Sequence, residues 1–284
     1  MRIAATIFLT DETITPVHVA QALEQRGFAG LYLPEHTHIP ASRATPYPAG
    51  DPLPEEYGRT LDAFGALSAA AAVTRTLELG TAITLVAQHD PIVLAKQIAT
   101  LDHLSGGRFT LGVGFGWNRE EAEDHGVPWR QRRASVRDRM AVMRALWSAE
   151  PTAHDGDFAS VQASHAYPKP SGGTVRTLVG GSPGPLTFAQ VTAYADGWMP
   201  IGGGGLADAL PALRDAWQEA GRGPAAPLVV PTAVLPSAGK LARLAVERLA
   251  KHAARPTRRG GVRFARPHDD GGQTRRAAVE EALA

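Results

Sequence analysis

The sequence contains no cysteine among its 284 residues. Disulfides, thiolate metal sites, iron–sulfur clusters and cysteine nucleophiles are therefore excluded, and a reducing cytoplasm is the compartment we expect. An excess of charge is also lacking, since 29 basic and 28 acidic residues leave a formal net charge of +1. No global field attracts the chain to nucleic acid or to an anionic membrane, so any recognition of anions must be local.

Long hydrophobic runs are missing as well. The longest stretch of small apolar residues, 63–73, contains Gly65 and Ser68 and falls well short of the roughly 20 residues that span a bilayer. The N-terminal segment MRIAATIFLTDE has an apolar run too short for a secretory signal and predicts a strand instead. We therefore expect no membrane segment, and an ordinary apolar core, since 44% of the residues are hydrophobic.

The chain does show a regular alternation of short β-rich runs with helical patterns, which indicates repeated βα units around a parallel sheet. Seven strands are predicted, at residues 3–8, 30–34, 77–86, 109–113, 177–180, 197–201 and 228–234. Helices are predicted at 91–104, 133–148 and 206–220, where apolar residues recur at helical spacing. Asp90 and Pro91 are the expected N-cap and first residue of the first of these helices.

This pattern favours an α/β fold with a single domain over residues 1–284, a TIM (β/α)8 barrel. Such barrels take roughly 250 residues, and no linker or internal repeat divides the chain. Residues 235–284 are the atypical part, because from residue 253 onwards there are seven arginines and few large apolar residues. Only 262–265 resembles a strand there, so we expect imperfect closure of the barrel.

Residues that follow the strands are the informative ones, because catalytic groups of such barrels gather at the carboxyl ends of the strands. After the second strand, LPEHTHIP places Glu35, His36 and His38 together. A carboxylate beside imidazoles can serve as acid–base apparatus, as metal ligands or as a hydrogen-bonded loop anchor, and for His38 a structural role is favoured. A metal-dependent hydrolase would need further ligands after later strands, and TLVGG and GWMPIGG provide none, so no metal site is predicted.

Glycines mark the ends of the fourth and fifth strands. LGVGFGWN puts Gly112, Gly114 and Gly116 at alternate positions, where a flat ligand can approach the backbone or where the strands simply bend and pack. The pattern lacks the third glycine of a dinucleotide fingerprint and follows a fourth strand, so a Rossmann site is rejected. After the fifth strand, the Gly-Gly-Ser segment 180–182 offers backbone N–H groups to a phosphate.

Several segments together carry a family resemblance. They are LPEHTHIP, GTAITL, AKQIATLDHLSGGRFTLGVGFGW, NREEAEDHG, the Gly-Gly of LVGG and ADGWMPIGG, and they span roughly residues 1–235. In these segments the chain resembles the luciferase-like monooxygenase superfamily, and within it the branch that depends on the deazaflavin coenzyme F420. The most specific stretch is 95–117, in which Asp102 and Arg108 are expected to fix a helix-to-strand turn rather than to act in catalysis.

The resemblance implies a tricyclic cofactor ring in the barrel mouth, with Glu35 and His36 near its reactive face and His36 as the main catalytic candidate. It also implies a wall behind the ring and contacts around the ring, its side chain and its phosphate. The wall would be Thr81, Ala82 and Ile83, with a non-prolyl cis bond between Ala82 and Ile83, and the contacts would be Gly114, Phe115, Gly116, Trp117, Asn118, Gly180, Gly181 and Ser182.

The chain departs from the sugar-phosphate dehydrogenases of that branch. They carry an acidic residue at the end of the fourth strand, where this chain has Gly116 and Trp117. That substrate class is therefore not expected here.

Two further features each allow two interpretations. A basic cluster consists of Arg130, Arg132, Arg133, Arg137 and Arg139. It either attracts the anionic tail of a deazaflavin or, as we favour, is the solvated face of a helix whose other face holds Val136, Met140 and Met143. Tyr32, Tyr47 and the proline-rich loop 46–54 form either a cover over a substrate or a stiff connector.

The function predicted from residues and resemblance is a cytoplasmic oxidoreductase that uses reduced F420 to move a hydride to a small organic substrate. With FMN, a separate reductase and molecular oxygen, the same barrel would instead act as a monooxygenase. A non-catalytic flavin-binding protein is the remaining alternative. No nucleic-acid or membrane partner is expected, and the resemblance implies that the barrel can form a homodimer.

Overall fold

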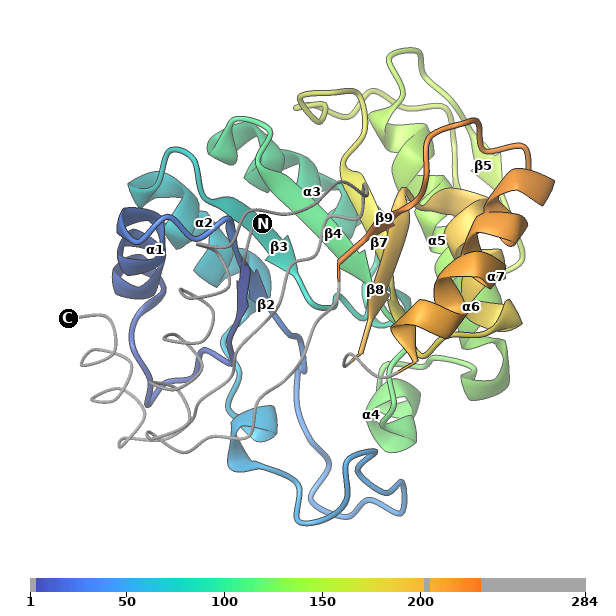
Figure 1. The fold of residues 1–284 in the computed structure, drawn as a ribbon. Coiled ribbons are helices and arrows are strands. Elements are labelled where there is room, and N and C mark those ends of the chain that lie inside the picture. The colour runs from blue at the N-terminus through green and yellow to red at the C-terminus, as the bar shows by residue number, and fades with distance from the viewer. Residues whose placement is uncertain (1–3, 202–204, 231–284) are drawn as a thin grey trace.

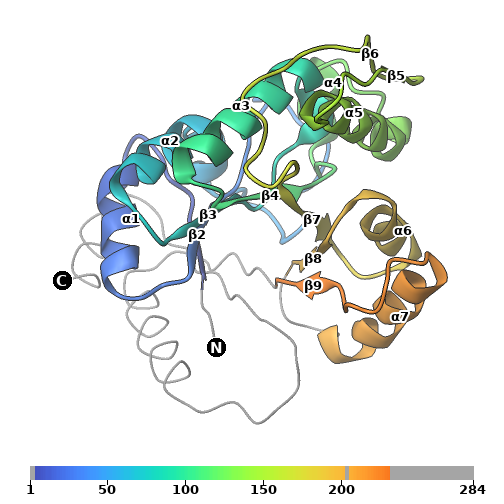
Figure 2. The same cartoon turned by 90° about the horizontal axis from the view of Figure 1, so that it is seen from above.

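The computed structural model describes residues 4–201 and 205–230, which form a parallel sheet that curves around an inner core (Figure 2). The sheet has seven strands in the order β1-β2-β3-β4-β7-β8-β9. Their bounds are β1 Ala4–Thr6, β2 Gly30–Leu33, β3 Glu78–Thr81, β4 Phe109–Val113, β7 Arg176–Gly181, β8 Gly197–Pro200 and β9 Leu228–Val229. The α/β barrel architecture is thus confirmed as a curled half-barrel, while the candidate strand 262–265 and all of 235–284 lie outside the described residues.

Strand positions follow the sequence closely except after β3. β4 has the predicted bounds, but β3 ends at Thr81, well before the expected residue 86. The chain continues through a cis peptide bond between Ala82 and Ile83 and forms one more bridge to β4, between Thr84 and Val113. It then enters the 3-10 turn η2, Val86–Gln88. The prediction of a longer strand was wrong. The β-branched residues after Thr81 lie in a turn, in which Ile83 packs against the glycines of β4.

Helices cover the outer face of the sheet (Figure 2). They are α1 Pro16–Gln25, α2 Ala63–Val73, α3 Pro91–Ser105, α5 Arg132–Trp147, α6 Pro185–Tyr194 and α7 Leu206–Glu219. The N-cap predicted for α3 is confirmed, since Asp90 Oδ1 accepts hydrogen bonds of 2.9 Å from the backbone N–H groups of Ile92 and Val93. Within the described residues, no helix is long and apolar enough to cross a membrane.

The apolar stripe of α5 shows how these helices are held. Val136, Met140 and Met143 are completely buried and Trp147 is 2% exposed, so the residues at helical spacing are core, as predicted. Burial of each such side chain contributes about 1.5–3 kcal/mol relative to exposure. The helices therefore fix the sheet, and through it the positions of the loops at the two ends of the strands.

At the amino ends of the strands, the turn between α3 and β4 has the structural role expected for Asp102 and Arg108. Asp102 Oδ2 accepts a 2.7 Å hydrogen bond from the backbone N–H of Ser171. The guanidinium of Arg108 donates to the carbonyl oxygens of Ala71, Thr74 and Leu77. This end of the barrel is thus tied by backbone contacts.

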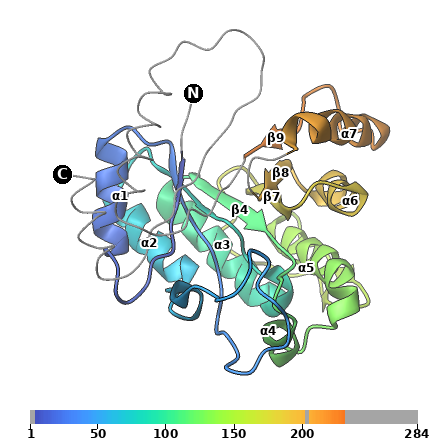
Figure 3. The same cartoon turned by 60° about the horizontal axis from the view of Figure 1, so that its bottom comes forward.

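At the opposite end, two long connections extend below the sheet in Figure 1 and come forward in Figure 3. The first joins β2 to α2 and contains the 3-10 turn η1, Glu55–Gly58. The second joins β4 to α5 through α4, Arg119–Asp124, and η3, Trp129–Gln131. A two-stranded antiparallel pair, β5 His154–Asp155 and β6 Ser160–Val161, follows α5 and was not predicted. The two long connections carry most of the predicted site.

Candidate active site

The wall of the mouth is built by the chain just after β3. The side chain of Ile83 occupies the space beside three glycines, since a Cβ atom on Gly114 would lie 2.0 Å from Ile83 Cδ1 and one on Gly180 would lie 2.6 Å from Ile83 Cγ2. Thr81 is fully buried, and its Oγ1 accepts a 3.0 Å hydrogen bond from the backbone N–H of Gly112. Close packing of Ile83 against the strands thus depends on the glycines at positions 112, 114 and 180. This is the structural one of the two interpretations, in which the glycines let the strands bend and pack.

The predicted residues Thr81, Ala82 and Ile83 therefore do form one wall with β4 and β7. Ala82 and Ile83 remain partly exposed, whereas Thr81 offers no surface to a ligand. The cis peptide bond expected between Ala82 and Ile83 is present.

Glu35 joins the segment after β2 to the turn after β3. It is 7% exposed, its Oε2 accepts a 2.6 Å hydrogen bond from the backbone N–H of Leu85, and its Oε1 accepts one of 2.7 Å from His89 Nε2. Burial lowers the pKa of His89, but the hydrogen bond to Glu35 and the charge of that carboxylate outweigh the burial and raise it overall. Both oxygens of Glu35 are engaged in holding the turn after β3.

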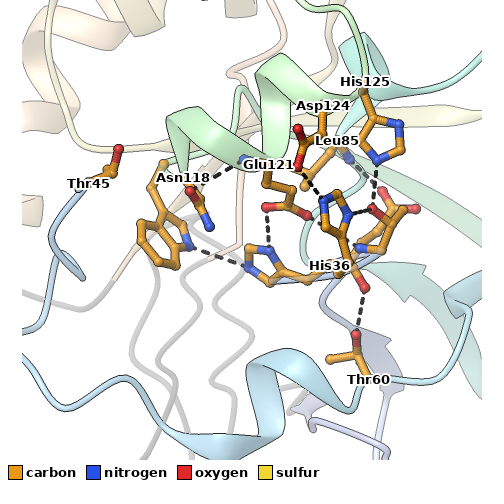
Figure 4. A network of polar contacts seen from close by, with 12 residues as sticks. His36, Thr45, Thr60, Leu85, Asn118, Glu121, Asp124 and His125 are labelled. Carbon is orange, nitrogen blue, oxygen red and sulfur yellow. Dashed lines mark hydrogen bonds and ion pairs between the residues drawn. The ribbon is translucent and has the colours of Figure 1, made fainter. Parts of the chain in front are cut away.

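His36 is held differently, by a carboxylate from the second long connection (Figure 4). Its Nδ1 lies 2.8 Å from Glu121 Oε2, and the His36 and Glu121 side chains are 6% and 0% exposed. An ionised carboxylate only accepts hydrogen bonds, so Nδ1 is assigned the proton and Nε2 is an acceptor. Trp117 Nε1 donates a long hydrogen bond of 3.4 Å to this Nε2.

The local sequence explains how Glu121 reaches His36. Asn118 is the N-cap of α4, and its side chain accepts from the backbone N–H of Glu121, three residues later. Glu121 Oε1 also accepts a 3.3 Å hydrogen bond from the backbone N–H of Thr37. The carboxylate thus bridges α4 and the segment after β2, although 85 positions separate it from His36.

Aromatic side chains surround the imidazole of His36. The rings of Tyr57 and Trp117 have their centroids 5.2 Å and 5.9 Å from it. Tyr47 packs on both of these rings, and its hydroxyl lies 3.0 Å from that of Tyr57. The loop 46–54 therefore contributes Tyr47 to the wall around His36.

Tyr32 does not belong to the aromatic side chains around His36. It is buried in the barrel, and its hydroxyl donates to Glu78 at the amino end of β3. Of the two interpretations, the cover over a substrate does not hold for Tyr32, because this residue lies buried in β2 itself rather than in a loop.

Two buried polar atoms near the wall lack a hydrogen-bond partner within the described part of the chain: Asn118 Nδ2 and Gln88 Oε1. Asn118 is fully buried. Gln88 lies near Gly116, where a Cβ atom would be 3.9 Å from Gln88 Nε2. The φ of +72° at Gly116 is one that favours glycine. Buried amide groups are rarely left unpaired, so both atoms suit a polar ligand.

The segment after β7 contributes backbone rather than buried side chains. The carbonyl oxygen of Gly181 accepts a 2.9 Å hydrogen bond from Trp198 Nε1, and Ser182 is exposed. Gly184 precedes α6, and no side chain caps this helix. The phosphate role of Gly180, Gly181 and Ser182 stays a prediction.

On the outer side of α4, His38 is a loop anchor, as favoured from the sequence. His38 Nε2 lies 3.0 Å from Asp124 Oδ2, and Thr37 Oγ1 lies 2.6 Å from His125 Nε2. Burial, and then the nearby His38, lower the pKa of His125. Within residues 4–201 and 205–230, no group of three or more histidine, aspartate or glutamate side chains is arranged to hold a metal ion.

The basic cluster divides in two. Arg130 and Arg137 are exposed, as expected for a solvated helix face, but Arg132 and Arg133 are half-buried. Arg139 donates to the carbonyl oxygen of His89 and to Ser135 Oγ, so it supports the turn after β3. The prediction of one solvated face was wrong for Arg132 and Arg133, because they precede Val136 by four and three positions and so share its side of α5.

Sequence reasoning missed Glu121, Tyr57 and Gln88 as site residues. A signal existed only for Glu121, since asparagine followed three residues later by glutamate is typical of a helix start. Nothing in the sequence could indicate that this carboxylate faces His36.

Comparisons with known proteins identify the family of the chain. The family model described as luciferase-like monooxygenase matches residues 15–282. An uncharacterised protein of Mycobacterium tuberculosis is 44% identical over 249 residues, which are 86% of this chain and 88% of the relative. An F420-dependent glucose-6-phosphate dehydrogenase of Beutenbergia cavernae is 31% identical over 200 residues, which are 68% of this chain and 55% of the relative.

Solved structures share the fold. A monooxygenase from Streptomyces bottropensis gives a TM-score of 0.68 at 23% identity, over 89% of this chain and 77% of the other. An F420-dependent secondary alcohol dehydrogenase with an F420–acetone adduct gives a TM-score of 0.67 at 20% identity, over 99% of this chain and 82% of the other. Because the family model spans most of its length, the chain belongs to the luciferase-like monooxygenase family.

Proposed function

We propose that this protein is a cytoplasmic oxidoreductase that uses reduced coenzyme F420 to transfer a hydride to a small organic substrate. The observation that carries the proposal is the pairing of His36 with Glu121 inside an aromatic wall. The partly exposed residues Ala82 and Ile83 follow the neighbouring parallel strand at the same end of the sheet. Family membership supports an enzyme of the oxidoreductase and monooxygenase type. FMN is the alternative cofactor.

The residues at the mouth fit a tricyclic cofactor. Asn118 Nδ2 and Gln88 Oε1 are a buried donor and a buried acceptor without partners among the described residues, and a ring with carbonyl and N–H groups offers both complements. Ala82, Ile83 and Trp117 supply apolar and aromatic surface. Gly114, Phe115 and Gly116 would complete the contacts of the ring, and Gly180, Gly181 and Ser182 would hold a phosphate.

When bound, the reduced cofactor supplies the hydride. The protein's own contribution centres on Nε2 of His36, where a substrate oxygen would replace the long hydrogen bond from Trp117. From the imidazolium form, Nε2 would give its proton to that oxygen while Nδ1 stays on Glu121. The carboxylate fixes the tautomer and stabilises the imidazolium. Tyr47, Tyr57 and Trp117 exclude water from that side of the imidazole.

The choice of F420 over FMN rests on the sequence resemblance. The similar proteins include some named for F420 and one described with FMN. The glucose-6-phosphate dehydrogenase and the secondary alcohol dehydrogenase are named as F420-dependent, while an oxygenating component of a diketocamphane monooxygenase is described in complex with FMN. Equilibrium titration with each cofactor separately tests the choice. Tighter binding of F420 is expected, and binding of neither would overturn the proposal.

His36→Ala separates an enzyme from a non-catalytic flavin-binding protein. We expect turnover to fall by about 10²–10⁴-fold, since that is the usual contribution of general acid–base catalysis. Cofactor affinity should be retained. Because His36→Ala leaves Glu121 buried without its partner, His36→Asn serves as a second variant whose amide can still donate to Glu121. Retention of full turnover in both variants would contradict the role of His36.

A further inference from the structure

A cavity of about 330 Å³ lies at the amino ends of the strands, at the opposite end of the sheet from His36. Residues at the starts of β3, β4 and β7 line it, together with the turn between α3 and β4 and the segment that leads into β7. Its volume is in the range of roughly 300–1,000 Å³ that is usual for pockets that hold small molecules. Its charged lining residues are Glu78, Asp102, Arg108 and Arg176. Two carboxylates and two guanidinium groups thus line one small volume.

Asp102 contributes a carboxylate of which only one oxygen is used. The residue is 3% exposed, and its Oδ2 accepts the 2.7 Å hydrogen bond from the backbone N–H of Ser171. Its Oδ1 has no hydrogen bond or ion pair to residues 4–201 and 205–230, and it keeps some accessible surface on the side of the cavity. Buried charged groups are normally paired, so this oxygen suits a cationic donor from a ligand.

Arg108 lines the same cavity but cannot supply that donor. All five N–H groups of its guanidinium are used within the chain. Their acceptors are the carbonyl oxygens of Ala71, Thr74, Leu77 and Ser105 and the hydroxyl oxygen of Thr74. The free carboxylate oxygen therefore stays without a cation from this turn.

Arg176, at the start of β7, offers the opposite charge. Its side chain is 47% exposed, and its Nη1 donates a 3.2 Å hydrogen bond to Glu78 Oε2. The other oxygen of Glu78 accepts from the hydroxyl groups of Tyr32 and Thr110. The remaining N–H groups of Arg176 have no partner among the described residues, and the planar fork of arginine can bind a carboxylate through two N–H groups. The cavity thus combines an unused carboxylate oxygen with an unused guanidinium edge.

We propose that this cavity binds a small zwitterion of the α-amino-acid class, whose ammonium group donates to Asp102 Oδ1 and whose carboxylate accepts from Arg176. A ligand with positive charge alone would meet two guanidinium groups, and one with negative charge alone would meet two carboxylates. A ligand that carries both charges satisfies both sides of the cavity. Because His36 lies at the other end of the strands, the zwitterion is a second ligand rather than the substrate.

A series of related ligands tests which charges the cavity recognises. The common L-amino acids are screened one by one for a rise in the melting temperature of the protein. The strongest is then titrated by isothermal calorimetry beside its methyl ester, which lacks the carboxylate, and its N-acetyl derivative, which lacks the ammonium group. We expect each derivative to bind about 10- to 100-fold more weakly, as for the loss of a hydrogen bond between charged groups. No rise with any amino acid, or equal binding of the three compounds, would overturn the proposal.

Two variants assign each charge of the ligand to a residue. In Asp102→Asn, which keeps an acceptor for the backbone N–H of Ser171, the amino acid should bind no better than its N-acetyl derivative. In Arg176→Gln, it should bind no better than its methyl ester. Arg75→Gln is the matched control and should bind the amino acid like the wild type, because Arg75 is exposed just before β3 and does not line the cavity.

Arg176→Gln keeps the test decisive if Asp102→Asn fails to fold, because Arg176 is half-exposed and forms one hydrogen bond with the described residues. An undiminished preference of Arg176→Gln for the amino acid over its ester would place the ligand elsewhere and reject the site. None of these measurements requires F420 or FMN. Failure of the proposed function would therefore leave the zwitterion site standing, and the reverse also holds.

Discussion

His36 and Glu121 show how a single contact can decide the role of a residue. An imidazole after a barrel strand can be an anchor, a ligand or an acid–base group, and the partner of each nitrogen separates these roles. His38 meets Asp124 at the surface and is an anchor. His36 meets a completely buried carboxylate through Nδ1, and its Nε2 accepts only a long hydrogen bond of 3.4 Å from Trp117 among the described residues. Glu121 is therefore a positioning residue for His36.

Glu121→Gln should lower turnover by about 10- to 100-fold while cofactor affinity stays unchanged, because the amide no longer fixes the tautomer or balances the imidazolium. Nitrogen NMR of His36 should then show a mixture of tautomers instead of the Nδ1-protonated form alone. Glu123→Gln is the control, since Glu123 forms an exposed pair with Arg119 on the same helix. Wild-type turnover in Glu121→Gln would refute the positioning role.

A second prediction at the residue scale concerns the space beside Gly114. Gly114→Ala should destabilise the protein by about 1–3 kcal/mol, because the new methyl group would overlap Ile83 Cδ1 at 2.0 Å. Ile83→Val removes that Cδ1 atom and should recover part of the loss in the double variant. Denaturant unfolding measures the free energy of unfolding of the two single variants and the double variant. Gly58→Ala, where no atom lies within 4 Å, should be nearly neutral. Additive losses in the double variant would show that the two residues do not compete for space.

At the scale of elements, the sequence predicted regular segments well and the junctions between them poorly. The cap of α3 and the buried stripe of α5 could be predicted because they depend on neighbours within one helix. The early end of β3 could not, since it depends on glycines of β4 about 30 positions later. The same limit applies to Arg132 and Arg133. Their spacing to Val136 was visible in the sequence, but the lack of a carboxylate partner for them among residues 4–201 and 205–230 was not.

Glu24 joins two elements through a carboxylate that depends on pH. Its Oε1, near the end of α1, accepts hydrogen bonds from the backbone N–H groups of Arg75, Thr76 and Leu77, which lead into β3. Burial raises the pKa of Glu24, but these bonds lower it overall, from 4.5 to about 2. The unfolded chain therefore takes up the proton first, so this contribution is complete above pH 4.5 and is lost as the pH falls towards 2.

Glu24→Gln should accordingly lower the melting temperature at pH 7 and make it less sensitive to acid. The difference between wild type and variant should shrink as the pH falls below 4.5. Solvent screening keeps the effect small, because the carboxylate is mostly solvated. Differential scanning calorimetry between pH 7 and pH 3 measures it. A difference that stays constant with pH would show that the charge of Glu24 is irrelevant to these bonds.

At the scale of the whole molecule, the two ends of the half-barrel differ in their polar contacts. At the amino ends of the strands, the guanidinium of Arg108 is bound to backbone carbonyl groups and ties the turn between α3 and β4. At the carboxyl ends lie buried atoms of Asn118, Gln88 and Arg133 that have no hydrogen-bond partner among the residues the structure describes. The alternation of strands and helices was enough to predict the architecture and this polarity. It could not predict which loop side chains meet, because loop geometry depends on contacts across the sheet.

This polarity predicts where a cofactor protects the backbone. In hydrogen exchange, saturating F420 or FMN should slow the amides of 82–89 and 114–131, which carry the unpartnered atoms, and those of 34–60 around His36. Binding at 100-fold excess over the dissociation constant adds about 2.7 kcal/mol to global stability, so protection common to all amides must first be subtracted. The turn at 102–108 provides the reference for that subtraction, since it lies at the far ends of the same strands. Protection concentrated at 102–108 instead would place the ligand at the wrong end of the barrel and separate it from His36.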